Sequence, residues 1–148
     1  MRINILLYSF TPFLPFPLIY PFYLFYPFHP MYPISATVIR GLGNGRKFGF
    51  PTANLQLDMP MEIENGVYAA WVMVEEKRYK GMLYVGTRPS LGLTEKTYEV
   101  HLLHFSGNLY GKKLSFEVVQ FIRPEQKFES VEALVEQLKK DRELVESI

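Results

Sequence analysis

The chain has 148 residues, enough for a single domain with a buried core. Its formal net charge of +1 gives no electrostatic case for binding nucleic acid or an anionic membrane. The chain has no cysteine and three histidines, which excludes a disulfide framework and a thiolate zinc site and disfavours a three-histidine metal site. The absence of cysteine is compatible with a reducing compartment.

Residues 1–34 differ in composition from the rest of the chain. They contain one charged side chain and seven of the eleven prolines. A regular membrane-spanning helix is disfavoured by the close spacing of Pro12, Pro15, Pro17 and Pro21. No small-residue cleavage site follows a compact apolar core, which disfavours a signal peptide. We expect a poorly ordered leader or a mis-set start codon, with a membrane role as the remaining alternative. Residues 35–148 form the expected functional domain.

A β-branched run at residues 36–40 predicts the first strand, and a glycine-rich stretch follows it. Alternating glycines allow a backbone to approach a phosphate closely, and two cations come next: Gly41, Gly43 and Gly45, then Arg46 and Lys47. The spacing does not fit a Walker A loop, and Arg46 occupies the third glycine of a dinucleotide fingerprint. A phosphate-binding loop and a plain turn both stay open.

The stretch ends in Phe50, Pro51, Thr52, Ala53 and Asn54. The proline favours an extended backbone before it, and Thr52 and Asn54 are two residues apart, so they share a side of an extended segment. A hydroxyl and an amide carbonyl are hard oxygen donors of the kind magnesium accepts beside phosphates and waters. Alternatively, both side chains bond the backbone of a turn.

The remaining pattern predicts a hairpin and two further strands. Residues 66–74 and 79–85 are apolar and β-rich around a polar turn at 75–77, and residues 87–96 have the proline and glycines of a loop. Strands are predicted at 98–105 and 114–122, with a turn at 106–108. On the former strand Glu99, His101, Leu103 and Phe105 share one face. Glu99 is either functional or an exposed edge carboxylate. His101 and His104 are predicted on opposite faces, which prevents them from binding one ion.

The last segment has helical spacing. Its apolar positions predict a core-facing stripe with Ser130 as the N-cap: Val131, Leu134, Leu138 and Val145. We expect Asp141 and Arg142 on a solvated face. The chain is therefore predicted to be mainly β, a small antiparallel barrel with a C-terminal α-helix.

The glycine-rich stretch through Asn54 resembles the flavokinase motif of riboflavin kinases. Further segments resemble family motifs in the same order: 66–69, 86–89, 99–103, 109–111 and 123–125 with Phe128. The resemblance covers about residues 36–148 and is closest to the kinase module of bacterial bifunctional riboflavin kinase/FAD synthetase. Tyr84 departs from the family, which often has Asn there, and Ser90 stands where many members have Thr. These departures leave the flavin contacts of the 86–90 loop open.

The resemblance implies a six-stranded Greek-key barrel and an ATP-dependent riboflavin kinase that makes FMN and ADP in the cytoplasm. It implies that Thr52 and Asn54 bind Mg²⁺, or another divalent metal, and the phosphates of ATP. Glu99 would be the catalytic base. The other implied sites are ATP-binding (Gly41, Gly43, Gly45, Arg46, Lys47 and Tyr110) and flavin-binding (Arg123 and Phe128). From sequence alone, Tyr110 is equally well a core tyrosine and Arg123 a surface arginine.

Two other functions stay as alternatives. One is a non-catalytic flavin- or nucleotide-binding barrel, and the other is a barrel that binds single-stranded nucleic acid, which the balanced charge disfavours. Residues 1–34 are too short and too rich in proline to be an adenylyltransferase domain, so we expect no FAD synthesis by this chain. A separate FMN adenylyltransferase domain or protein is a candidate partner. No nucleic-acid or membrane partner is expected.

Overall fold

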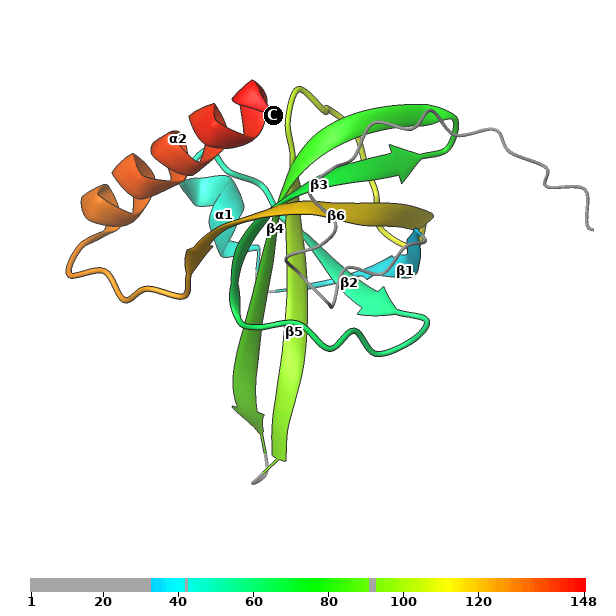
Figure 1. The fold of residues 1–148 in the computed structure, drawn as a ribbon, viewed down its shortest axis with the longest axis horizontal. Coiled ribbons are helices and arrows are strands. Elements are labelled where there is room, and N and C mark those ends of the chain that lie inside the picture. The colour runs from blue at the N-terminus through cyan, green and yellow to red at the C-terminus, as the bar shows by residue number, and fades with distance from the viewer. Residues whose placement is uncertain (1–32, 42, 91–92) are drawn as a thin grey trace, which may run out of the picture.

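The computed structural model describes residues 33–41, 43–90 and 93–148. In these ranges the chain forms a closed antiparallel barrel with the strand order β1-β2-β5-β4-β3-β6 (Figure 1). The strands are β1 Ile34–Ile39, β2 Ala53–Leu57, β3 Gly66–Val74, β4 Lys77–Ser90, β5 Leu93–Leu102 and β6 Lys113–Pro124. The helices are α1 Asn44–Lys47 and α2 Val131–Ser147. Strand β6 pairs with β3 after the β3–β4–β5 meander, so the predicted six-stranded Greek-key barrel with a C-terminal helix is confirmed.

Nearly all of the predicted leader, residues 1–32, lies outside the described residues. Within the described part of the chain, neither helix is long and apolar enough to cross a membrane.

The prediction of a loop at residues 87–96 is wrong. Strands β4 and β5 stay paired there as far as Ser90 opposite Leu93, and they project as a long hairpin beyond the barrel (Figure 1). Past Val85, β4 pairs only with β5, which leaves an open strand edge on which a proline lacking its N–H is tolerated. At the other end, β5 stops at Leu102, before the predicted end at residue 105, and His104 has a left-handed φ of 56°. Helix α1 was not predicted either, because the glycine-rich stretch that contains it indicated a loop or a turn.

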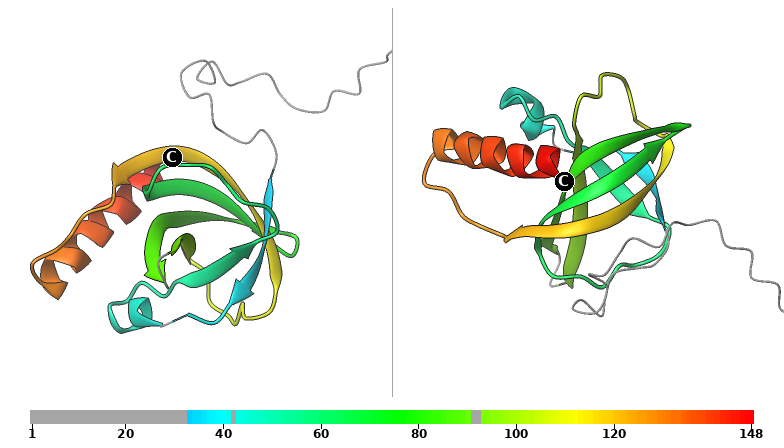
Figure 2. Two further views of the ribbon diagram at one scale, coloured as in Figure 1. Left: turned by 90° about the horizontal axis from the view of Figure 1, so that it is seen from below. Right: turned by 45° about the horizontal axis from the view of Figure 1, so that its top comes forward.

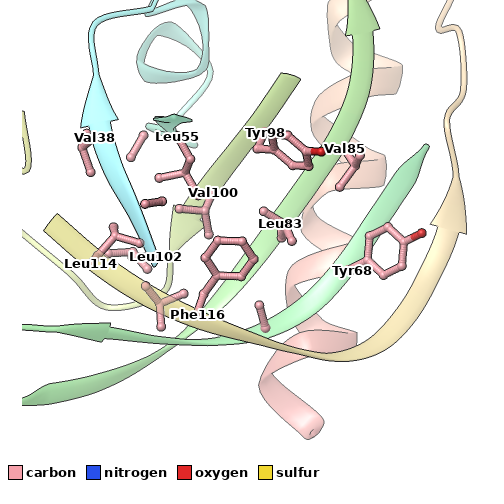
Figure 3. Close-up of a cluster of buried hydrophobic side chains, with 14 of the residues drawn as sticks. Val38, Leu55, Tyr68, Leu83, Val85, Tyr98, Val100, Leu102, Leu114 and Phe116 are labelled. Atoms are coloured by element: carbon pink, nitrogen blue, oxygen red, sulfur yellow. The ribbon is translucent and has the colours of Figure 1, made fainter. Parts of the chain in front are cut away.

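Alternate side chains from every strand fill the barrel interior (Figure 3). Leu83, Val85 and Phe116 are among the most deeply buried of them. On β6, the inward Leu114 and Phe116 alternate with Ser115 and Glu117, so the strand predicted at 114–122 has one face in the barrel interior. Because side chains occupy the inside of the barrel, any ligand site has to use its outer surface or its rim.

Helix α2 packs on the outside of the barrel, as the two further views show (Figure 2). Its Val145 belongs to a second apolar cluster with Phe50, Ala69, Met82 and Leu103. Two register shifts in the β3–β6 pairing leave Val119 and Ile122 as extra residues, and both pack against this second cluster. The bulged residues therefore place two apolar side chains of β6 on the outer face beside the helix, while Val118 and Phe121 stay in the barrel interior. Ser130 caps α2 as predicted, since its Oγ accepts a hydrogen bond from the Ala133 N–H at 3.1 Å.

A buried ion pair joins α2 to the end of β6. Arg123 Nε donates to Asp141 Oδ2 at 2.9 Å and Oδ1 at 3.1 Å, and its Nη2 lies 2.9 Å from Oδ2. Gln137 Nε2 donates to the same carboxylate at 2.9 Å. The Asp141 side chain is 0% exposed, so the expectation that it lies on a solvated face is wrong. The bulge at Ile122 makes this ion pair possible. Strict alternation from the inward Phe121 would turn Arg123 into the barrel, away from Asp141.

Replacing Asp141 by Ala is expected to lower the free energy of unfolding by about 3–5 kcal/mol, because it leaves the guanidinium of Arg123 without its counter-ion in a largely buried place. Urea unfolding of the full chain measures this. The matched control is Glu136→Ala on the same helix, which removes the exposed pair with Lys139 and should change stability little. Equal effects of the two substitutions would contradict the role given to the buried pair.

Candidate active site

One row of outward side chains crosses five strands of the barrel. Asn54 on β2 pairs with Glu99 on β5, and Glu99 pairs with Tyr84 on β4. Tyr84 in turn pairs with Val67 on β3, and Val67 pairs with Arg123 on β6. Asn54, Glu99 and Tyr84 each have two inward-pointing neighbours, and Val67 is followed by the inward Tyr68, so these four lie on the outer face. The bulge at Ile122 brings Arg123 to the same face, where it contacts Asp141 of α2. The row brings together Asn54, Glu99 and Arg123, which are far apart in the sequence.

The end of the row at β2 is rich in oxygen atoms. Thr52 Oγ1 donates a hydrogen bond to Glu99 Oε2 at 3.0 Å, and all three side chains, Thr52, Asn54 and Glu99, are half-buried. A hydroxyl, an amide and a carboxylate are therefore held side by side by the β2–β5 pairing. The hydroxyl and amide oxygens are donors of the kind that a hard cation beside phosphates accepts, and the carboxylate is a group that can take up a proton.

The glycine-rich stretch lies directly against this end. A Cβ at Gly41 would overlap the side-chain amide of Asn54, and a Cβ at Gly45 would overlap the carbonyl oxygen of Phe50. Gly43 has a φ of 69°, which favours glycine. The stretch folds into α1, and Arg46 and Lys47 lie exposed in its last turn. The glycines thus allow the backbone to pack tightly onto the residues expected to bind phosphate, and they leave two cations at the rim.

Tyr110 lies beside the start of the same stretch. The Gly111 N–H donates to the Val38 carbonyl at 2.9 Å, which fixes this loop against β1. The guanidinium carbon of Arg40 lies 5.5 Å from the centroid of the Tyr110 ring, and Tyr110 is 52% exposed. The alternative of a core tyrosine is therefore wrong, and an exposed ring stands next to the glycine-rich stretch.

The opposite end of the row is apolar and basic. The Arg123 guanidinium carbon lies 5.6 Å from the centroid of the Phe128 ring, so the two predicted flavin residues are neighbours. Arg123 forms an ion pair with Asp141, and its side chain is 15% exposed. These two observations exclude the alternative of an ordinary surface arginine. The sequence analysis included Glu125 only as part of a family motif and Tyr84 only as a departure from a family pattern, and it predicted no contact for either residue. Only the strand register reveals that Tyr84 is next to Glu99.

The two histidines near the site make separate contacts. His101 Nδ1 lies 2.8 Å from the Pro51 carbonyl oxygen, while His104 Nε2 lies 3.2 Å from Glu146 Oε1. Because β5 ends at Leu102, His104 lies beyond the strand, and the prediction that the two histidines occupy opposite faces of one strand is wrong. Across the described ranges, no group of three or more His, Cys, Asp or Glu side chains is placed to hold a metal. A metal here would depend on substrate phosphates and waters for most of its ligands.

Comparisons with known proteins place these residues in a family. The model of the riboflavin kinase (flavokinase) family matches residues 29–148. The RNA-binding riboflavin kinase RibR of Bacillus subtilis is 38% identical over 109 residues, covering 73% of this chain and 47% of that protein. The bifunctional riboflavin kinase/FMN adenylyltransferase of Escherichia coli is 39% identical over 109 residues, covering 73% of this chain and 35% of that protein. The chain thus spans about half or less of these relatives.

Solved structures share the fold. The riboflavin kinase from Trypanosoma brucei has a TM-score of 0.58 at 25% identity and covers 78% of this chain and 77% of that chain. A crystal structure named as a macrolide-efflux protein from Streptococcus pneumoniae has a TM-score of 0.74 at 34% identity, covering 78% of this chain and 38% of that chain. The family resemblance read from the sequence motifs is confirmed by the family match.

His101 holds the segment that leads into Thr52. Its Nδ1 faces a carbonyl oxygen and is therefore the N–H donor, and its ring packs edge-on against Phe50 with centroids 5.3 Å apart. Burial lowers the pKa of His101, the charge of Arg142 lowers it further, and the hydrogen bond to Pro51 opposes both. His101 is consequently neutral in the folded protein at neutral pH.

We expect His101 to make the fold sensitive to acid. Its pKa is lower in the folded chain than the usual value of about 6.5, so protons bind the unfolded chain preferentially. The stability contributed by neutral His101 is complete above the unfolded pKa and is lost as pH falls through the folded pKa. Between about pH 7.5 and about pH 5, wild type should lose more unfolding free energy than His101→Gln, which keeps an N–H donor but does not titrate. Parallel losses in chemical denaturation of both proteins would refute this.

Proposed function

The chain belongs to the riboflavin kinase family, and we propose that it transfers the γ-phosphoryl group of ATP to the 5′-hydroxyl of riboflavin, giving FMN and ADP. One observation carries the proposal: the 3.0 Å hydrogen bond from Thr52 Oγ1 to Glu99 Oε2, with Asn54 paired beside Glu99. An alcohol placed against Glu99 is then next to the residues assigned to the nucleotide. Phosphoryl transfer depends mainly on this positioning and on charge neutralisation.

The nucleotide belongs at the β2 end of the row. Backbone N–H groups of the glycine-rich stretch and the cations Arg46 and Lys47 would bind the phosphates. The exposed ring of Tyr110 offers a stacking surface for adenine, and its contact with Arg40 keeps it beside the first glycine.

Thr52 and Asn54 are the residues proposed to hold Mg²⁺, with another divalent metal as the alternative. Their hydroxyl and amide oxygens fit a hard cation that keeps phosphate and water ligands. When bound, such a metal supplies charge neutralisation for the phosphates. The contact between Thr52 and Glu99 means that the same hydroxyl also orients the carboxylate.

Glu99 is proposed to act as the general base. A primary alcohol is a poor nucleophile, and the carboxylate takes its proton as the bond to phosphorus forms. The flavin ring would lie at the other end of the row, against Phe128 and the exposed edge of Arg123. The order of the row, from a carboxylate at Glu99 to a ring and a guanidinium at Phe128 and Arg123, suits an acceptor that has an alcohol at one end and a ring at the other.

A non-catalytic flavin- or nucleotide-binding barrel is the less favoured candidate. A protein that only binds its ligands has no need of a carboxylate held by a hydroxyl beside the phosphate residues, and this chain has that contact. Release of ADP in the presence of riboflavin separates the two candidates.

Partners and location are also proposals. The name of the Bacillus subtilis relative describes it as RNA-binding, so the expectation of no nucleic-acid partner, which rests on a net charge of +1, stays a prediction for a salt-dependent oligonucleotide titration. The name of the Escherichia coli relative includes FMN adenylyltransferase. We propose that a separate domain or protein converts the FMN made here to FAD. A cytoplasmic location is proposed, and the cysteine-free sequence is compatible with it.

Incubating the chain with riboflavin, ATP and magnesium is expected to yield FMN, detected by mass spectrometry as a flavin heavier by one phosphoryl group. Removing the divalent metal with a chelator should stop the reaction, and added magnesium should restore it. A sample that binds both substrates but forms no FMN would support the non-catalytic barrel instead.

Glu99→Gln is expected to lower kcat by about 10²–10⁴-fold while riboflavin still binds, because only the proton acceptor is lost. Steady-state kinetics and a flavin-fluorescence titration measure the two effects. The matched control is Glu95→Gln, an exposed carboxylate on the same strand and with the same alternation. Wild-type turnover by Glu99→Gln would remove this residue from the mechanism.

A further inference from the structure

Tyr84 has no role in the mechanism above, yet it occupies the middle of the row. It pairs with Glu99 on one side and with Val67 on the other, and Val67 leads to Arg123. A molecule that reaches from Glu99 to the Arg123 end must therefore pass over the strand that carries Tyr84. This position lies between the reacting alcohol and the ring of the proposed acceptor.

The phenol of Tyr84 is held in place by specific contacts. Its O–H donates to Glu125 Oε1, and Asn65 Nδ2 donates to Glu125 Oε2 at 3.4 Å and to Thr87 Oγ1 at 3.3 Å. The ring lies against the backbone of Gly86, where a Cβ would come within 2.7 Å of ring carbons. Glycine at 86 is what allows the phenol to lie flat along its own strand and reach Glu125.

The direction of this hydrogen bond defines what the phenol can offer a ligand. Burial raises the pKa of Tyr84 to about 12, and the hydrogen bond to Glu125 contributes to the rise. The phenol therefore stays protonated in the neutral range and donates its proton to the carboxylate. Its oxygen keeps lone pairs that accept hydrogen bonds.

We propose that Tyr84 is a specificity-determining residue for the acceptor, and that its oxygen accepts a hydrogen bond from a hydroxyl within the polyol chain of that acceptor. The inference rests on the proposed function. It names the feature that this part of the site selects, which is an acceptor with hydroxyl groups between its aromatic ring and its terminal alcohol. Glu125 acts as a positioning residue that fixes the proton, and hence the lone pairs, of the phenol.

The test compares two acceptors with wild type and Tyr84→Phe. One acceptor is riboflavin, and the other is a flavin whose side chain keeps only its terminal hydroxyl. Tyr84→Phe keeps the ring against Gly86 and removes one acceptor atom, so riboflavin affinity and kcat/KM should fall by about 3- to 10-fold. Affinity for the analogue and the KM for ATP should not change. Tyr79→Phe, on the same strand and next to Phe105 in the apolar core, is the matched control and should alter neither substrate.

A second variant tests the positioning role. Glu125→Gln keeps an oxygen acceptor for the phenol O–H and should retain the preference for riboflavin over the analogue, whereas Glu125→Ala should reduce it. Thermal unfolding of each variant shows whether the fold is intact.

The outcomes separate this inference from the function on which it rests. Equal losses of affinity for the two flavins in Tyr84→Phe, or no loss for either, would overturn the inference while leaving the kinase assignment standing. Failure of the wild-type chain to make FMN from riboflavin and ATP would overturn the proposed function itself.

Discussion

The pairing of β2 with β5 and of β5 with β4 is the constraint on which the site depends. It sets Asn54 beside Glu99 and Glu99 beside Tyr84. Side chains alternate along a strand, so a slip of one residue in either pairing would turn Glu99 from the outer face into the barrel. The apolar neighbours Tyr98 and Val100 prevent such a slip, because it would expose both of them. The hydrophobic interior therefore specifies the position of the outer carboxylate without touching any ligand.

The two ends of the site are fixed by different physical means. At the proposed nucleotide end, the absence of a side chain at Gly41 lets the backbone lie on Asn54, so geometry there is set by close packing. At the proposed acceptor end, the bulge of β6 turns Arg123 outward, and the buried Asp141 anchors its guanidinium. The anchoring carboxylate comes from α2, so the helix, which lies outside the barrel, has a direct connection to the proposed flavin site. This accounts for a charged side chain that is fully buried on a helix whose Val145 packs in the second apolar cluster.

Much of the fold was predictable from the sequence because the barrel interior imposes a clear period of two. The alternation around Phe116 illustrates this. Residues 66–74 were recognisable instead as a continuous apolar run, because most of β3 is buried on both faces. The wrong predictions concern residues whose structure is decided by partners distant in the sequence rather than by their immediate neighbours. Pro89 indicated a loop, but an open strand edge tolerates it, and Asp141 appeared solvated because nothing nearby in the sequence reveals Arg123 as its partner. The candidate site residues followed from sequence motifs. The position of Tyr84 between Glu99 and Val67 could be known only from the register of three strands. Long-range pairing is the information that a single sequence carries most weakly.

The filled interior also explains why the proposed chemistry is assigned to the outer face. Phe116 and its neighbours fill the inside of this narrow barrel, so the proposed substrates would lie across the strands. A row of one residue per strand then becomes an ordered series of environments: oxygen donors at Asn54, a carboxylate at Glu99, a phenol at Tyr84, an apolar contact at Val67 and a guanidinium at Arg123. With the phosphates of the nucleotide at Asn54, the proposed acceptor, which has an alcohol end, a hydroxylated middle and an aromatic end, matches the rest of that series in order. Closure of the sheet, which buries the other face of every strand, is what makes the series continuous.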